Sequence, residues 1–169
     1  MKSTTGKLIG IAIKKASREP MILVEHATVT VDEGIENDYK GSIKKRQITV
    51  LACEAWDEAC AQIKVELHWT SRRANLLIEG VSLMNSTDNL LCIGDVVLKI
   101  NGKTTPCWRM DEIAQGLMDS LNTDWRCGVK CSVIKGGEIS VGDAVTVCSL
   151  TESSFIPGIN GKCPDKTLQ

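Results

Sequence analysis

A lone thiol follows a proline in the stretch Pro106-Cys107-Trp108-Arg109. A thiolate is a soft metal ligand and a sulfur nucleophile, so Cys107 is a candidate for metal binding or for sulfur transfer. Both roles need the ionised thiol, which a nearby cation such as Arg109 favours. A small apolar cysteine at a loop end is the structural alternative, and judged from this stretch alone it is the commoner case.

A second cluster, Arg72-Arg73-Ala74-Asn75, comes directly before the apolar run Leu76-Leu77-Ile78. The planar guanidinium group of arginine matches phosphate and carboxylate geometry. A solvated pair of surface charges explains the same residues equally well. The cluster therefore indicates an anion site without requiring one.

Polar side chains that could line a site also occur in the glycine-punctuated segment 35–45. Asp38 and Lys40 are its candidates, with turn chemistry and solvated charge as their alternatives. His26, on the polar face of an alternating strand, has no acidic partner by spacing and is interpreted as a surface residue. Cys127 and Cys131, four apart on a predicted strand, lie roughly 13 Å from each other, too far to share a zinc ion.

The element that must position Cys107 is predicted to be a hairpin. Residues 96–100 form a β-rich run, Asn101-Gly102 is typical of a two-residue type I′ turn, and residues 103–105 form the returning strand. Pro106 has no N–H to donate and ends the pairing. We therefore expect Cys107 at a strand end, on a rim where reactive groups are commonly carried.

The remaining pattern predicts a mainly β fold. One helix is expected at 53–63, from the spacing of Trp56, Cys60 and Ile63, and another follows Cys107, from the spacing of Ile113, Leu117 and Leu121. Strands are expected at 7–13, 24–31, 47–51, 76–78, 125–134 and 144–147. Many short strands without βαβ alternation favour a largely antiparallel barrel.

The composition of the chain argues against a nucleic-acid-binding, secreted or membrane protein. The 169 residues fit one domain, and the net charge of −1 gives no basic field for nucleic acid. The chain has no secretory apolar region and no run near the roughly 18 apolar residues of a membrane helix. We expect a cytoplasmic protein with eight reduced thiols and no membrane partner.

Residues 1–148 are predicted to form the domain, and the Ser-, Pro- and Gly-rich residues 149–169 are predicted to form a loosely ordered tail.

A series of short motifs, in this order, resembles the MOSC domain, the module named for the C-terminal domain of molybdenum cofactor sulfurases. The motifs are Gly34-Ile35-Glu36-Asn37-Asp38, Arg46-Gln47-Ile48-Thr49-Val50, Arg73-Ala74-Asn75, Glu79-Gly80-Val81-Ser82-Leu83, Ile93-Gly94-Asp95, Pro106-Cys107, Trp125-Arg126-Cys127-Gly128-Val129 and Gly142-Asp143-Ala144-Val145. The resemblance extends over about residues 7–147. It implies a MOSC-type β-barrel, similar to the pyruvate kinase barrel, with two or three helices.

The resemblance also implies roles for the candidate residues. Cys107 would be the catalytic residue and molybdenum ligand, and arginines would meet the pterin phosphate of the cofactor. The implied cofactor-binding residues are Arg73 with Asn75 and Arg126, with Arg72, Asp38 and Lys40 as further candidates. Relatives often have Gly-Asp where this chain has Asn37-Asp38.

The expected function is that of a molybdenum cofactor (molybdopterin) binding protein that reduces N-oxygenated small molecules. It would need an external electron donor, because the chain has no flavin or nicotinamide fingerprint. The alternatives are a non-redox carrier of sulfurated cofactor or sulfur for a recipient molybdoenzyme, and a barrel that binds without the cofactor. Pyridoxal phosphate, although associated with the sulfurase name, is not expected here, because the domain that uses it needs far more than 169 residues.

Overall fold

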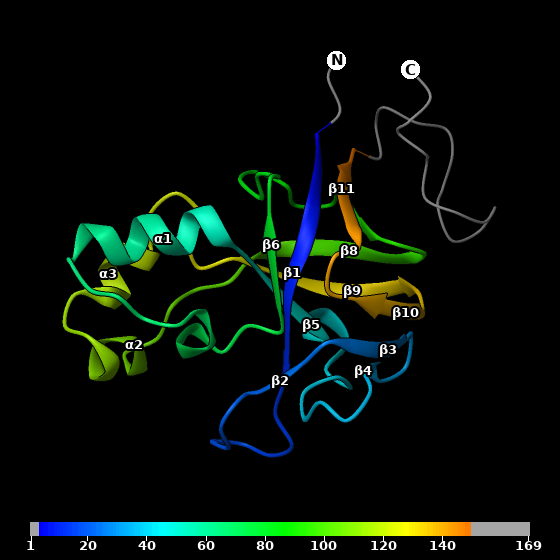
Figure 1. Cartoon of the computed structure of the whole chain (residues 1–169), viewed down its shortest axis with the longest axis horizontal. Helices are drawn as coiled ribbons and strands as arrows, with labels where there is room; N and C mark the ends of the chain where they lie inside the picture. The colour runs from blue at the N-terminus through cyan, green and yellow to red at the C-terminus, as the bar shows by residue number, and fades with distance from the viewer. Residues whose placement is uncertain (1–3, 150–169) are drawn as a thin grey trace.

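The computed structural model describes residues 4–149, so the predicted tail lies outside the described residues except for Ser149. Figure 1 shows a barrel with its helices gathered on one side. The α-helices are α1 (Cys53–Gln62), α2 (Arg109–Ile113) and α3 (Leu117–Leu121), with 3₁₀ turns η1 (Lys44–Arg46) and η2 (Trp69–Arg72). The strands are β1 (Thr5–Ile13), β2 (Ile22–Val24), β3 (His26–Thr30), β4 (Gly34–Ile35), β5 (Ile48–Ala52), β6 (Leu76–Glu79), β7 (Leu90–Ile93), β8 (Val96–Lys103), β9 (Val129–Lys135), β10 (Gly137–Ser140) and β11 (Ala144–Cys148).

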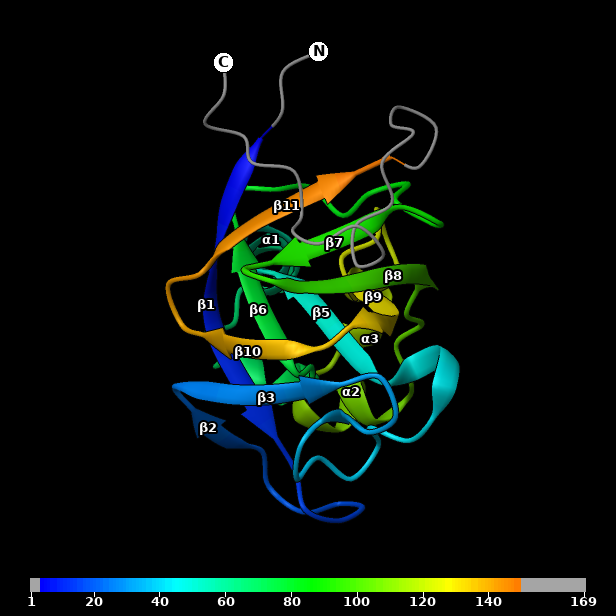
Figure 2. The same ribbon diagram turned by 90° about the vertical axis from the view of Figure 1, so that its right-hand side faces the viewer.

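Seven of these strands close into a barrel in the order β11-β7-β8-β9-β5-β6-β1. Closure comes from β11, which pairs with β7 through Val145 and Ile93 and with β1 through Thr146 and Thr5. The β5–β6 pair is parallel and the other pairs are antiparallel. A small sheet, β10-β3-β4, lies beside the barrel (Figure 2). The prediction of a mainly β barrel with two or three helices is confirmed.

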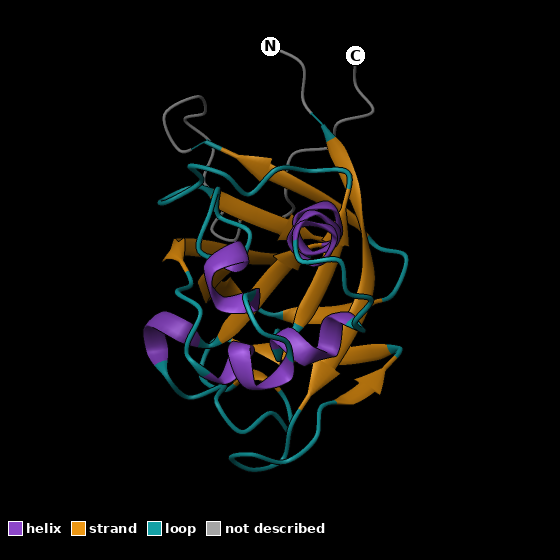
Figure 3. Ribbon diagram, turned by 90° about the vertical axis from the view of Figure 1, so that its left-hand side faces the viewer, coloured by secondary structure: helices purple, strands orange, loops and turns teal. Residues whose placement is uncertain are grey.

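Strand β5 shows why its sequence is continuously apolar. Ile48 and Val50 point into the barrel core, whereas Leu51 points out and packs in the cluster that contains Trp56 of α1 and Leu117 of α3. Both faces of the strand are therefore buried, as in a sheet covered by helices. Figure 3 shows the helices lying over this side of the barrel.

The predicted hairpin at Asn101-Gly102 is wrong. β8 continues through both residues and pairs with β9, with an irregularity in register between Ile100 and Gly102. The Asn101 amide donates to Ser132 Oγ (2.6 Å) and to the Lys45 carbonyl (3.0 Å), so it links β8 to β9 and to η1 instead of forming a turn. The tight turn lies earlier, between β7 and β8, where Gly94 has φ of 56°. Pro106 still follows the end of the strand.

The single helix predicted after Cys107 is also wrong, because α2 and α3 are separate. Ala114 is extended, and Gly116 has φ of 91°, so the helical path is broken between them. Asp111 accepts a hydrogen bond from the Met118 N–H (2.9 Å) and thereby holds the two short helices together. Ile113 is 41% exposed, whereas Leu117 and Leu121 are buried as expected.

Two predicted strands are shorter or divided in the structure. The strand expected at 125–134 begins only at Val129, because Asp124 and Trp125 have positive φ values of 51° and 62° and form a turn. Cys127 therefore precedes β9, whereas Cys131 lies on it. The strand expected at 24–31 divides into β2 and β3.

Asn75 joins three neighbouring strands at one end of the barrel. Its Oδ1 accepts from the Thr49 N–H (3.0 Å) of β5, and its Nδ2 donates to the Ala12 carbonyl (3.2 Å) of β1. Its own N–H donates to Thr49 Oγ1 (3.1 Å) just before β6 begins. The side chain is 7% exposed, so water cannot easily replace these bonds.

Asn75→Ala should lower the free energy of unfolding by about 2–4 kcal/mol, because it leaves a buried N–H and a buried carbonyl with fewer partners. Urea denaturation of the full chain measures this loss. Asn122→Ala is the matched control, since Asn122 is exposed and its side chain makes no hydrogen bond to the described residues. Equal stabilities for the two variants would contradict the strand-linking role.

Candidate functional site

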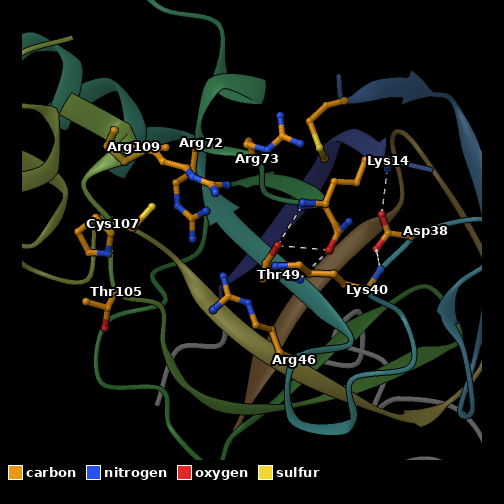
Figure 4. Close-up of a pocket in the computed structure, with 14 residues that line it drawn as sticks. Lys14, Asp38, Lys40, Arg46, Thr49, Arg72, Arg73, Thr105, Cys107 and Arg109 are labelled. Carbon is orange, nitrogen blue, oxygen red and sulfur yellow. Dashed lines mark hydrogen bonds between the residues drawn. The ribbon is translucent and has the colours of Figure 1, made fainter. Parts of the chain in front are cut away.

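A cavity of about 310 Å³ lies at the barrel end that Asn75 holds together. Its walls come from the end of β1, from β5, from the start of β6, from the segment 38–46 and from residues 105–110 after β8. Figure 4 shows Arg72 and Arg109 on the side that carries Cys107, and Lys14, Asp38 and Lys40 on the opposite side. Segments far apart in the sequence therefore converge on one small volume.

The cavity has a strong excess of positive charge. Asp38 is the one carboxylate among the described lining residues, against the six cations Lys14, Lys40, Arg46, Arg72, Arg73 and Arg109. Such a lining favours an anion with several charged oxygens, for which arginine and lysine are the usual partners.

Burial and the crowding of cations lower the pKa of two lining residues, Lys14 and Arg46. Burial, followed by the charges of Arg73 and Lys40, lowers the pKa of Lys14 to about 8, although Asp38 opposes the shift. Burial and the charge of Arg72 lower the pKa of Arg46, while Cys127 and Cys107 act to raise it. A bound anion would relieve the repulsion at both positions.

Arg72 is buried and held by neutral acceptors. Its Nε donates to the Cys127 carbonyl (2.9 Å) and its Nη2 to Thr104 Oγ1 (2.6 Å), while the Thr104 hydroxyl donates to the same carbonyl (2.7 Å). No carboxylate pairs with Arg72 in these contacts. Its orientation is fixed, and its positive charge remains available to a ligand in the cavity.

Arg73, Asp38 and Lys40 are fixed by the backbone in a similar way. Arg73 has φ of 64°, and its Nη2 donates to the Glu19 carbonyl (2.6 Å). The Asp38 carboxylate accepts from the backbone N–H groups of Lys14 (3.0 Å) and Lys40 (3.4 Å). Asp38 therefore ties the loop to the end of β1 and places the Lys14 and Lys40 side chains on the cavity wall.

Cys107 is exposed and lines the cavity directly after the buried Pro106. Its carbonyl accepts from the Met110 N–H (2.9 Å), so the first turn of α2 fixes its backbone. Within residues 4–149 there is no group of three or more His, Cys, Asp or Glu that could hold a metal ion. A metal at this site would have one thiol from the protein and would need ligands from a cofactor.

The other described cysteines do not line this cavity. Free thiols are also found at Cys53, Cys60, Cys127, Cys131 and Cys148. Cys92 is disulfide-bonded, which departs from the expectation of eight reduced thiols. Burial raises the pKa of Cys60 and of Cys131, as expected for unreactive core thiols.

Arg126 is the one predicted site residue that the structure places elsewhere. Its Nη1 donates to Gln62 Oε1 (2.6 Å) and to the Ser120 carbonyl (3.2 Å), and its Nε lies 3.7 Å from Glu58 Oε2. The left-handed turn at Trp125 precedes it, and the Arg126 side chain packs against α1 and α3. It lines a different cavity, beside Glu58 and Val81.

The structure brings together Asp38, Lys40, Arg72, Arg73, Asn75 and Cys107, as the sequence pattern predicted, and adds Lys14 and Arg46. Each of these two cations stands next to a buried strand: Lys14 follows β1, and Arg46 lies two residues before β5. A charge at the end of an apolar run was therefore the available signal.

Comparisons with known proteins agree with this architecture. The model of the MOSC domain matches residues 36–146. The YuaD protein from Bacillus subtilis has a TM-score of 0.74 and 18% identity, over 88% of this chain and 98% of that chain. YiiM from Escherichia coli has a TM-score of 0.64 and 14% identity, over 88% and 71% of the two chains. YiiM from Geobacillus stearothermophilus has a TM-score of 0.67 and 12% identity, over 85% and 75%.

At these identities the structural likeness establishes the fold alone. A search of the curated proteins finds no significant match. No helix among the described residues is long and apolar enough to cross a membrane.

Sulfate binding to the full chain should weaken as the pH rises through about 8, because Lys14 loses its proton there. Sulfate keeps a charge of −2 over this range, so calorimetric titration between pH 6.5 and 9.5 reports the protein group. In Lys14→Gln the affinity should be lower and nearly independent of pH. Lys15→Gln is the control, because Lys15 is exposed and does not line the cavity. A pH dependence that persists in Lys14→Gln would assign the titration to another group.

Proposed function

We propose, because the chain belongs to the MOSC domain family, that its cationic cavity binds the molybdenum cofactor (molybdopterin) and that Cys107 ligates the metal. The observation that carries the proposal is an exposed thiol on the wall of a cavity lined by six cations and one carboxylate. An anionic cofactor with a soft metal needs both features.

The chemistry of the lining fits such a group. Lys14, Lys40 and Arg46, with Arg72 and Arg73, would hold the phosphate of the pterin, since each offers positive charge and N–H donors. Cys107 would give the metal one thiolate, and the cofactor would bring further ligands of its own. Asn75 is a positioning residue, because its amide is committed to Thr49 and Ala12.

The proposed reaction is the reduction of N-oxygenated small molecules. When bound, the cofactor supplies two-electron redox chemistry. For a hydroxylamine the balance is R–NH–OH + 2 e⁻ + 2 H⁺ → R–NH₂ + H₂O, so the N–O bond breaks and its oxygen leaves as water. The electrons come from an external donor protein, and the exposure of Cys107 leaves the reacting end of the cavity open to water as a source of protons.

A second candidate function is favoured by the same exposure. An accessible thiol can carry a persulfide or present sulfurated cofactor to a recipient molybdoenzyme without redox turnover. The two functions differ in whether the protein, loaded with cofactor, consumes electrons in the presence of an N-hydroxylated compound.

Protein purified from a host that makes the cofactor should contain molybdenum and pterin in near-equal amounts, and Cys107→Ser should lose most of the molybdenum. Serine keeps the shape but stays protonated at neutral pH, so the soft ligand is lost. Arg46→Gln should lower both molybdenum and pterin several-fold, because it removes one charge from the phosphate site. Metal analysis and pterin fluorescence measure the two components.

Cys53→Ser is the matched control, since Cys53 is a free thiol outside the cavity whose pKa burial and Asp57 raise to about 11. Wild-type molybdenum content in Cys107→Ser would remove Cys107 as the ligand. Protein without molybdenum and without pterin would leave the barrel as a binding module that acts without the cofactor.

A further inference from the structure

A second hollow, of about 360 Å³, adjoins the cationic cavity and shares three residues with it, Arg73, Arg109 and Met110. Its other walls are Arg18, Trp108, Glu112 and Ile113. We call it the Trp108 groove. Trp108 follows Cys107 in the chain, and the shared residues let a molecule in this groove extend into the cavity that Cys107 lines.

The groove exposes apolar surface that a folded chain would normally cover. Trp108 is 61% exposed and Ile113 is 41% exposed, although both are large hydrophobic residues. The guanidinium carbon of Arg109 lies 5.8 Å from the centre of the Trp108 ring. An exposed indole beside a planar cation is a surface on which a planar ring can stack.

The rim of the groove is positively charged. Three arginines, Arg18, Arg73 and Arg109, stand against the single acid Glu112 among the residues that line it. One nitrogen of Arg73 is committed to the Glu19 carbonyl. The side chains of Arg18 and Arg109 make no hydrogen bond or ion pair with the described residues, so their donors are available to an anionic group.

The size of the groove favours a small molecule over a protein as its occupant. A hollow of this volume is at the low end of the range for small-molecule sites, about 300–1,000 Å³. A stable protein contact needs about 800 Å² on each partner, far more than two exposed apolar side chains provide. The groove therefore fits the body of a small substrate.

We propose that the Trp108 groove selects planar aromatic substrates that carry a carboxylate or phosphate, an inference that rests on the proposed function. The aromatic ring stacks on Trp108, the anionic group pairs with Arg18 and Arg109, and the N-hydroxylated end enters the cavity beside Cys107. Aliphatic or uncharged aromatic N-hydroxylated compounds make only part of these contacts and are poorer substrates.

Binding of 2-naphthoate to the full chain, measured by calorimetry, tests the groove without turnover or cofactor. Trp108→Leu should weaken binding roughly tenfold, the scale of a stacking contact on an aromatic side chain. Arg18→Gln should weaken it roughly threefold, as expected for an exposed charge pair. Lys15→Gln, an exposed neighbour outside both hollows, should leave it unchanged. The uncharged 2-naphthamide and the non-aromatic cyclohexanecarboxylate should both bind more weakly than 2-naphthoate.

Equal 2-naphthoate affinity in wild type and Trp108→Leu would overturn the proposal and assign the exposed indole to another role, such as a protein contact. A loss in Arg46→Gln with none in Trp108→Leu would also overturn it, because the anion would then occupy the cationic cavity. Neither result affects the molybdenum content of the protein, so failure of the groove and failure of the proposed function are distinguishable.

With protein loaded with cofactor and an artificial electron donor, 4-carboxybenzamidoxime should have a higher kcat/KM than benzamidoxime. Arg18→Gln should lower this ratio roughly threefold. Trp108→Leu should lower kcat/KM for both compounds, since both contain the ring. An unchanged ratio in Arg18→Gln would contradict the anion contact even in an active reductase.

Discussion

The confinement of like charges at one end of the barrel is the constraint that the rest of the site must satisfy. Six cations share a cavity of about 310 Å³ with one carboxylate, and the pKa of Lys14 falls to about 8 as a result of burial and of that crowding. Below pH 8 Lys14 is charged in both the folded and the unfolded chain, so its unfavourable contribution to folding is fully present. As the pH rises from 8 to 10.5 the folded state releases the proton first, and this cost declines.

The scaffold tolerates the charge because its hydrogen bonds go mainly to neutral groups. Arg72 donates to the Cys127 carbonyl and to Thr104, and Arg73 donates to the Glu19 carbonyl. These acceptors fix the guanidinium groups without cancelling their charge, which a carboxylate partner would do. The Asn75 amide fixes the strands in the same way, because it hydrogen-bonds to Thr49 of β5 and to Ala12 of β1. A rigid site that still attracts anions is the consequence.

The sequence pattern predicted the barrel, and it named six residues that the structure places on the wall of one cavity. Strand β8 ends at Lys103, and Cys107 lies exposed after Pro106, at the rim position that the proline predicted. The predicted hairpin is wrong because the Asn101 side chain donates hydrogen bonds to Ser132 and to the Lys45 carbonyl. Both partners are distant in the sequence, so no local pattern shows these contacts. Arg126 lies outside the cationic cavity, since positive φ at Trp125 turns it toward α1, where it donates to Gln62. Lys14 and Arg46 were missed because single charges beside strands resemble ordinary solvated residues.

The architecture separates the two tasks that the proposed reaction requires. The cationic cavity is lined from the ends of barrel strands and from the segments 38–46 and 105–110. The Trp108 groove is built on the five-residue helix α2 and on the loop that carries Arg18, and its Met110 is buried in the core. Residues such as Trp108 and Ile113 are exposed, so they can change at little cost to stability. The residues of the Trp108 groove can therefore vary while the cationic cavity stays the same, and Cys107, adjacent in sequence to Trp108, lines that cavity.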